Sequence, residues 1–464
     1  MTITLIGYLL LPVGIYGFLF STKLLYKLTI FFLPFTASAI IYLGDDDASA
    51  LLLTVFFGLL WIINSIVKLS IKKNLINSNF FIHKGIFLLV LFLFICFLSI
   101  FLIPLTDNFK IFSIDLGRFS PLVIKSYHIN HLFFVTYGVL FAILLVNQNN
   151  NLNNIIETIK IYSYSIIFVI LWGMFEVFSN VFGANFPYFI FNNTPSDSEL
   201  GDSMRKLGEI GFFRMSSVGD EPSTIARSIL IVIPVFITSY LYKISIFSRK
   251  IDNFVLLLMS IGILATASSS GISGFILVLV ASIIIKAFLE ERILRPALLL
   301  MFVSIFLVVL YLNNELFAAY FEYIFLGKLS SDSFFNRLAT VTNSFDVFMS
   351  LPFFGAGFGS VTSDDLVIKL ISNTGIFGLS VFILLLIITQ AGLIKDMKLM
   401  KLVSKEMILF QVSICIIFFA YWLVTQIVGW SHQFQTGFFV LGLAFSLIRI
   451  KNSYKKEHIS KLKI

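Results

Sequence analysis

One stretch of this otherwise apolar chain gathers charged side chains of the kind that bind phosphate groups. From Asn192 to Arg227 the sequence reads NNTPSDSELGDSMRKLGEIGFFRMSSVGDEPSTIAR, and a long apolar run follows it. Charged groups are costly where a chain enters lipid, so they commonly serve a ligand. We therefore expect this stretch to contain the functional site. Its candidate residues are Arg205, Lys206, Arg214, Glu221 and Arg227.

Pro222 predicts that a helix starts directly after these charges. Proline suits the first turn of a helix, and Asp220 or Glu221 can cap it. The free N–H groups and positive dipole of such a helix end favour a phosphate, and Arg214 can add a bidentate contact from eight residues upstream. The spacing equally allows a structural interpretation, in which Arg214 and Arg227 only pair with Glu221 and Asp220 or reach lipid headgroups.

A second group of candidates lies between residues 336 and 365. Arg337 precedes the run LPFFGAGFGS, in which Gly355 and Gly357 permit positive φ angles and close approach to a substrate. Asp364 and Asp365 stand just before an apolar run, where a carboxylate can act as a general base toward a sugar hydroxyl. The simpler interpretations are a glycine-rich turn and a helix cap.

Histidines and one buried acid complete the candidates. His128 and His131 are three residues apart near a predicted helix start, so they can face a common cleft and contact a substrate. Scattered histidines without a supporting carboxylate pattern predict no metal site. Glu176, inside an apolar run, is expected to pair with an arginine such as Arg227. The chain has no P-loop, dinucleotide fingerprint or HExxH motif, so we expect no cofactor.

The elements that position these residues are predicted to be membrane-spanning helices. Hydrophobic residues make up 58% of the chain and charged residues 12%. No long alternating pattern is present, and lipid demands internal backbone hydrogen bonding, so the predicted fold is an all-α polytopic bundle of about 12–13 spans, forming one integral membrane domain over residues 1–464. Two neighbouring candidate spans, 253–268 and 271–287, require a very tight turn between them at Ser268–Gly271. The candidate spans are 3–21, 28–43, 49–67, 85–104, 131–146, 161–182, 223–242, 253–268, 271–287, 296–315, 366–389, 407–428 and 434–449.

The distribution of basic residues predicts the orientation. If the loop with Lys23 and Lys27 is cytoplasmic, the cytoplasmic side holds 23 of the 33 Lys and Arg residues, whereas 18 of the 25 acidic residues lie outside. The long loops 105–130, 183–222 and 316–365 are then extracytoplasmic. The net charge of +8 reflects this topology and membrane-lipid contact, not nucleic-acid binding. No cleavable signal peptide is expected, and Cys96 and Cys415 lie within spans, which argues against a disulfide.

Three segments together resemble the superfamily of O-antigen polymerases and ligases, most closely the oligosaccharide repeat-unit polymerases of the Wzy type. FFRMSSVGDEPSTIARSILIVIPVF is similar to the family's Arg and Gly-acidic-Pro element before a span. LATASSSGISGFILVL is similar to its Thr-x-Ser helix junction. NRLATVTNSFDVFMSLPFFGAGFGS, followed by SNTGIFGL, is similar to its Arg, Pro-x-x-Gly-x-Gly and Gly-x-x-Gly run. The resemblance covers roughly residues 205–380.

The resemblance implies a metal-independent glycosyltransferase that uses glycans linked to undecaprenyl diphosphate. It would extend polysaccharide of the O-antigen or capsule type at the outer face of the bacterial cytoplasmic (inner) membrane, with a chain-length regulator as a possible partner. Arg214 and Arg337 would then bind the diphosphate and stabilise it as the leaving group.

Two departures from the family leave the base unassigned. Many relatives have an arginine in the Thr-x-Ser junction, where this chain has Ser269-Ser270-Gly271. Ligases carry a histidine after the Gly-x-Gly loop, where this chain reads Thr362-Ser363-Asp364-Asp365, which favours a polymerase. The alternatives are a ligase that transfers glycan to lipid A core, with His128 or His432 as its base, and a polysaccharide flippase. A flippase is disfavoured because no internal repeat is evident.

Overall fold

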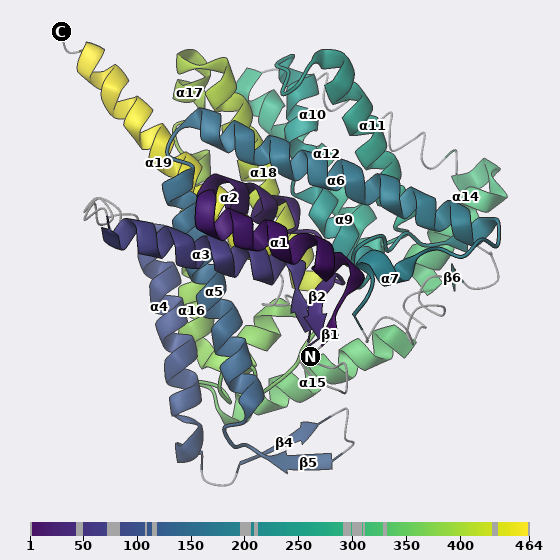
Figure 1. Ribbon diagram of the computed structural model, residues 1–464, viewed down its shortest axis with the longest axis vertical. Coiled ribbons are helices and arrows are strands. Elements are labelled where there is room, and N and C mark those ends of the chain that lie inside the picture. The colour runs from purple at the N-terminus through teal and green to yellow at the C-terminus, as the bar shows by residue number, and fades with distance from the viewer. Residues whose placement is uncertain are drawn as a thin grey trace.

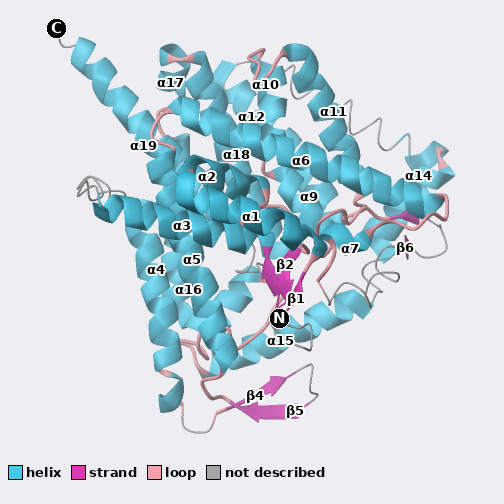
Figure 2. Ribbon diagram, in the orientation of Figure 1, coloured by secondary structure: helices cyan, strands magenta, loops and turns pink. Residues whose placement is uncertain are grey.

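A computed structural model shows an all-α bundle, and helices make up most of the chain (Figures 1 and 2). The structure describes residues 2–42, 50–71, 84–106, 109–113, 118–194, 206–207, 212–290, 298, 309, 311–327, 332–428 and 435–462. The helices of the first half are α1 (Leu5–Phe20), α2 (Thr22–Phe31), α3 (Leu53–Ile71), α4 (Lys84–Phe101), α5 (Ser126–Gln148), α6 (Leu152–Val181) and α7 (Tyr188–Phe191). Those of the second half are α9 (Pro222–Leu230), α10 (Ile233–Tyr242), α11 (Arg249–Ala265), α12 (Ser269–Glu290), α14 (Glu315–Phe321), α15 (Asp332–Ser350), α16 (Leu366–Ile394), α17 (Met397–Val403), α18 (Lys405–Val428) and α19 (Thr436–Leu462).

The prediction of a polytopic membrane protein is confirmed. Within the described residues, eight helical segments are long and apolar enough to cross a membrane. They are Leu53–Ser70, Lys84–Phe101, Ser126–Gln148, Leu152–Val181, Pro222–Tyr242, Ser269–Glu290, Leu366–Ile394 and Lys405–Gln426. The predicted tight turn is also present, because α12 begins four residues after α11 ends. The predicted span 296–315 lies mostly outside the described residues.

The predicted span 28–43 is wrong. Helix α2 ends at Phe31, and the chain then turns into the strand β2 (Ala39–Tyr42). Pro34 explains the early end of the helix, because proline disfavours helical geometry in the residue before it and lacks an N–H group. The expectation that helices are the only regular secondary structure is therefore wrong for the loops, because they contain short strands.

In the described part of the chain, three small antiparallel sheets lie outside the helices (Figure 2). One is formed by β1 (Thr2–Ile3), β2 and β3 (Ala50–Leu52). The other two are the hairpin β4 (Lys110–Ser113) and β5 (Arg118–Pro121), and the pair β6 (Lys206–Leu207) and β7 (Phe212–Phe213). Their strands are only two to four residues long, too short to register as an alternating apolar pattern.

Lysine side chains close the ends of three helices on the side predicted to be cytoplasmic. The ammonium group of Lys286 donates to the carbonyl of Leu241 in α10 (3.1 Å), and that of Lys401 donates to Leu289 in α12 (2.8 Å). Lys451 donates to the carbonyl of Lys395, directly after α16 (2.8 Å). Cations suit the negative C-terminal end of a helix dipole. These lysines therefore stabilise the bundle, and the orientation of the bundle in the membrane stays a prediction.

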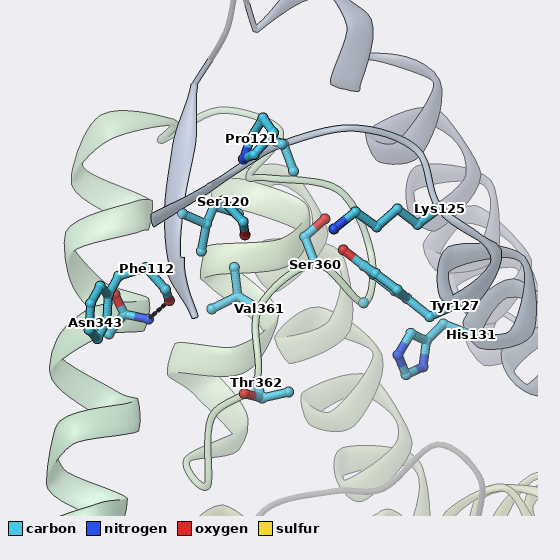
Figure 3. A pocket seen from close by; sticks show the side chains of 13 residues that line it. Phe112, Ser120, Pro121, Lys125, Tyr127, His131, Asn343, Ser360, Val361 and Thr362 are labelled. Atoms are coloured by element: carbon cyan, nitrogen blue, oxygen red, sulfur yellow. Dashed lines mark hydrogen bonds between the residues drawn. The ribbon is translucent and has the colours of Figure 1, made fainter. Parts of the chain in front are cut away.

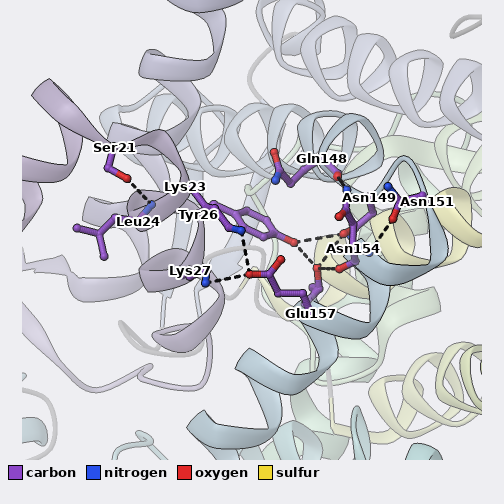
Figure 4. A network of polar contacts seen from close by, with 11 residues as sticks. Ser21, Lys23, Leu24, Tyr26, Lys27, Gln148, Asn149, Asn151, Asn154 and Glu157 are labelled. Atoms are coloured by element: carbon purple, nitrogen blue, oxygen red, sulfur yellow. Dashed lines mark hydrogen bonds and ion pairs between the residues drawn. The ribbon is translucent and has the colours of Figure 1, made fainter. Parts of the chain in front are cut away.

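The asparagine-rich segment 147–154 connects α5 to α6, and its side chains also contact α2 (Figure 4). The side chain of Asn149 accepts hydrogen bonds from Thr158 (2.8 Å) and from Tyr26 (3.4 Å). Beside it, Glu157 forms ion pairs with Lys27 (2.9 Å) and Lys23 (3.4 Å). These contacts therefore fix the position of α2 relative to α6.

Candidate functional site

The segment from Arg214 to Glu221 joins β7 to α9, and the backbone of its first half is held by two helices. The amide of Met215 donates to the carbonyl of Ala265 at the end of α11 (2.9 Å). The amides of Ser216 and Ser217 both donate to Oε2 of Glu176 in α6 (2.9 and 2.6 Å). Two neighbouring N–H groups directed at one carboxylate fix the path of this segment.

The second half of the segment is held by residues far away in the sequence. The amide of Ala37 donates to the carbonyl of Val218 (3.1 Å), and the side-chain amide of Asn192 donates to that of Gly219 (3.1 Å). The hydroxyl of Thr36 donates to the carboxylate of Asp220 (2.9 Å). Parts of the chain near residues 37, 176, 192 and 265 therefore hold Arg214 and Glu221 in a preorganised position.

Glu176 is buried, with 0% of its surface exposed, and its described hydrogen bonds are to backbone amides. Replacing it by alanine should lower the free energy of unfolding by about 3 kcal/mol, because two buried N–H groups lose their acceptor. Glu157→Ala on the same helix removes only partly exposed ion pairs and should cost less than about 1 kcal/mol. Thermal unfolding of both purified variants measures the difference, and equal losses would contradict this account of Glu176.

The guanidinium group of Arg214 lies at the C-terminal end of α11. Its Nε donates to the carbonyl of Thr266 (3.3 Å). Burial lowers the pKa of Arg214, and the nearby charge of Glu221 acts in the opposite direction. Tyr320 of α14 lies beside it, and burial raises the pKa of this tyrosine to about 12. An arginine with an ordinary pKa above about 12 stays charged in this setting.

Helix α9 begins at Pro222, as predicted, with Glu221 in the N-cap position. The carboxylate of Glu221 accepts a hydrogen bond from the hydroxyl of Ser223 (2.9 Å) and does not cap the helix through its side chain. Burial raises the pKa of Asp220, and the neighbouring charge of Glu221 raises it further. This end of α9 therefore presents two adjacent carboxyl groups, next to Arg214.

Arg227 lies one to two turns into α9. It contacts the hydroxyl of Thr224 (3.4 Å), and its charge acts on Asp220 and on Tyr421 of α18. The charges of Glu221 and Arg214 act on each other, as do those of Arg227 and Asp220, which agrees with the structural interpretation left open by the sequence. Phosphate binding by the same arginines stays a prediction.

Arg337 is on a different element from Arg214, and no described contact joins the two. It is in α15, one turn before Thr340, whose hydroxyl lies 3.4 Å from Asp364. Among the described residues, its guanidinium group makes no hydrogen bond or ion pair. Its predicted role with Arg214 at one diphosphate stays a prediction.

The two adjacent aspartates have different surroundings. Asp365 caps α16, because its carboxylate accepts the amide of Ile368 (2.8 Å), and it also accepts the side-chain amide of Gln426 (2.7 Å). Asp364 faces Thr340, and its charge acts on Lys369 one turn into α16. The helix-cap interpretation is therefore confirmed for Asp365, and Asp364, whose carboxylate accepts fewer described hydrogen bonds, is the better base candidate.

The glycine-rich loop packs its backbone against a break in α16. Gly375 has φ 65° and ψ −170°, which interrupts the helix. The carbonyls of Ser372 and Asn373 instead accept the amides of Ala356 (2.8 Å) and Gly357 (3.1 Å), and the amide of Ile376 donates to Pro352 (2.9 Å). A Cβ atom on Gly355 would lie 2.5 Å from the backbone of Asn373. Contact with α16 therefore explains Gly355, and substrate binding by Gly355 and Gly357 stays a prediction.

Asn373 is a residue that the sequence reasoning missed. Its side-chain oxygen accepts the amides of Gly359 (2.9 Å) and Val361 (3.0 Å), and its amide group donates to the carbonyl of Val361 (2.8 Å). It thus fixes the loop after the last glycine. The only sign of this role in the sequence is the position of Asn373 in the SNTG motif, two residues before Gly375.

His128 and His131 of α5 both reach this loop. The Nδ1 of His128 accepts the amide of Lys125 (3.0 Å), so Nε2 carries the proton and donates to the hydroxyl of Ser360 (2.8 Å). His128 is buried, and it locks the start of α5 to the loop. His131 packs against Gly359, where an added Cβ atom would lie 2.1 Å from its ring.

His131 lines a cavity of about 430 Å³ beneath the β4–β5 hairpin, which we call the hairpin cavity (Figure 3). Its polar walls come from the hairpin, the start of α5, α15 and the loop after Gly359. The sequence reasoning missed this cavity because the hairpin was not predicted. The lining residues are Ile111, Phe112, Ser120, Pro121, Leu122, Lys125, Tyr127, His131, Asn343, Gly359, Ser360, Val361 and Thr362.

The remaining candidates are not placed by the structure. Arg205 and His432 lie outside the described residues. Lys206 belongs to β6, but its side chain is not described. In the described part of the chain no group of His, Cys, Asp and Glu residues is arranged to hold a metal ion.

The fold and its apolar helices define a multi-pass helical membrane protein. Comparison with known proteins finds no protein-family model that matches the chain and no curated protein that is significantly similar to it.

Proposed function

We propose that this protein is a glycosyltransferase that polymerises oligosaccharide units linked to undecaprenyl diphosphate. Its site would face the outer side of the bacterial cytoplasmic membrane. The observation that supports this function best is the fixed position of Arg214 and Glu221 at the N-terminal end of α9. Among the described residues, nine hydrogen bonds to residues distant in the sequence hold the segment 214–220, more than a simple connector needs.

In the proposed reaction, Arg214 stabilises the diphosphate as the sugar–phosphate bond breaks. Negative charge grows on the phosphate oxygen that leaves, and a preorganised guanidinium beside a helix N-terminus can stabilise it without a metal ion. The acceptor hydroxyl attacks the anomeric carbon and transfers its proton to a carboxylate. Glu221 and Asp364 are the candidates for this base, whereas both carboxylate oxygens of Asp365 already accept hydrogen bonds.

A ligase is the second candidate function, and one observation favours it. His128 and His131 are brought to Gly359 and Ser360, which lie just before residues 362–365, the stretch where the family's ligases carry a histidine. His128 and His131 would be the candidates for the base in a ligase. The two enzymes differ in the acceptor, which is a second lipid-linked unit for a polymerase and a lipid A core for a ligase.

Chain growth by the purified protein tests the proposal. The full-length chain in detergent should convert undecaprenyl-diphosphate-linked repeat units from the source organism into a ladder of longer chains and release undecaprenyl diphosphate. No sealed membrane is present, so a flippase cannot produce this result. Chains that form only when a lipid A core acceptor is supplied would indicate the ligase, and the absence of transfer to either acceptor would overturn both enzyme assignments.

A further inference from the structure

We propose that the hairpin cavity is a glycan subsite for a sugar that carries a negative charge, a carboxylate or a phosphate. The ligand class rests on the proposed function, since it identifies the ligand as a glycan. The cavity of about 430 Å³ is of the size that proteins use for small-molecule ligands, about 300–1,000 Å³.

The charges around the hairpin cavity favour an anionic ligand. Lys125 and His131 line it, and no aspartate or glutamate is among the lining residues that the structure describes. The ammonium group of Lys369 in α16 lies close enough to His131 for its charge to act on the imidazole ring. The negative charge of Asp364 partly offsets the positive charge of Lys369. Among the lining residues, Lys125 is the cation that directly faces the cavity.

Several side chains around the cavity keep hydrogen-bonding capacity for a ligand. The ammonium group of Lys125 and the hydroxyls of Tyr127 and Thr362 make no side-chain hydrogen bond within the described part of the chain. Figure 3 shows the ends of Lys125, Tyr127 and Ser360 pointing toward the same space. Such a set can bind a charged substituent and the hydroxyl groups of a sugar ring together.

The walls of the cavity are braced before any ligand arrives. The side-chain amide of Asn343 in α15 donates to the carbonyl of Phe112 (3.0 Å), which ties α15 to the hairpin. Asn373 fixes the opposite wall through the amides of Gly359 and Val361. A preformed site loses little conformational entropy on binding.

A sugar fits the cavity better than the headgroup of a membrane lipid does. An apolar groove of about 330 Å³ lies between α3, α4 and α5, where an acyl chain would fit, and Ile129 and Thr136 of α5 line it. At 3.6 residues per turn, these residues project from roughly the opposite face of α5 to Tyr127 and His131. The headgroup of a lipid bound in that groove would therefore lie on the face of α5 that points away from the hairpin cavity.

Binding to the detergent-solubilised full-length protein tests this subsite without requiring polymerisation. Isothermal titration compares a glucuronate-containing disaccharide, its neutral glucose counterpart, and glycerol 3-phosphate as a mimic of a lipid headgroup. We expect the glucuronate disaccharide to bind at least about tenfold more tightly than the neutral one, with an affinity that falls as salt is raised. Lys125→Gln should remove most of this preference, and Thr362→Val should weaken binding of both sugars.

Lys110→Gln is the matched control, because Lys110 is an exposed lysine of β4 that does not line the cavity. Equal binding of the charged and neutral sugars, or equal effects of the two lysine variants, would overturn the proposal. Tightest binding of glycerol 3-phosphate would assign the cavity to lipid headgroups instead. If Lys125→Gln does not fold, two other measurements still test whether the cavity binds the charged sugar. They are the salt dependence of binding to the wild-type protein and the affinity of the Thr362→Val variant. Failure here with intact chain growth refutes only this subsite, and binding without chain growth refutes only the proposed reaction.

Discussion

Arg214→Ala is expected to abolish long glycan chains and to leave single-unit glycan and the amount of protein unchanged. In the purified assay, turnover should fall by about 10²–10³, the usual effect of removing one preorganised group that stabilises developing negative charge. The fold should tolerate the change, because the backbone of the segment is held by Glu176, Ala265 and Ala37 independently of the Arg214 side chain. Gel analysis of cellular glycan and the rate of undecaprenyl diphosphate release measure the two effects.

Two further variants show whether the chemistry of the guanidinium is needed. Arg214→Lys keeps the charge but loses the planar fork that contacts two phosphate oxygens, so it should also be poorly active. Arg249→Ala removes an exposed arginine at the start of α11 and should behave like the wild-type protein. Full-length ladders from Arg214→Ala would remove Arg214 from the proposed mechanism, and wild-type activity of Arg214→Lys would reduce its role to simple charge.

Gly375→Ala is expected to prevent stable folding, with a loss of about 3 kcal/mol or more in the free energy of unfolding. Its φ of 65° and ψ of −170° belong to a region that only glycine occupies readily. An added Cβ atom would also lie 2.0 Å from the carbonyl oxygen of Phe353, and a backbone atom cannot move aside as a flexible side chain can. The yield of monodisperse protein and the unfolding temperature measure the loss.

Gly183→Ala measures the cost of backbone strain without the steric clash that an added Cβ atom makes at Gly375. Gly183 has nearly the same φ, 69°, but no heavy atom lies within 4 Å of the position of its Cβ. Its replacement should therefore cost only about 1 kcal/mol, the strain of a left-handed residue. If the two glycine variants lose equal stability, close packing between the loop and α16 is not what Gly375 provides.

The sequence predicts the helices well because each long apolar run is a local signal. It fails at residues 28–43, where Pro34 ends α2 and the chain joins a sheet whose strands come from three separate segments. Strand pairing over such distances leaves almost no trace in a run of two to four residues. The shortness of the strands also hides the local β4–β5 hairpin, and with it the hairpin cavity.

The candidate site is predicted in part. The start of α9 at Pro222 follows from proline and its preceding acids, and the structure confirms it. The hydrogen bonds that the amides of Ser216 and Ser217 donate to Glu176 depend on two segments forty residues apart, which spacing cannot reveal. For the same reason the sequence brings Arg214 and Arg337 together only by resemblance, whereas the structure places them on separate elements.

The break in α16 also bears on how the chain is made. The first turns of this helix cannot complete their own backbone hydrogen bonds around Gly375, and lipid offers no substitute partners. The residues that complete them, Pro352 to Gly357, are synthesised just before the helix. The ribosome therefore delivers the partner first, and α16 can enter the bilayer with its missing bonds already supplied.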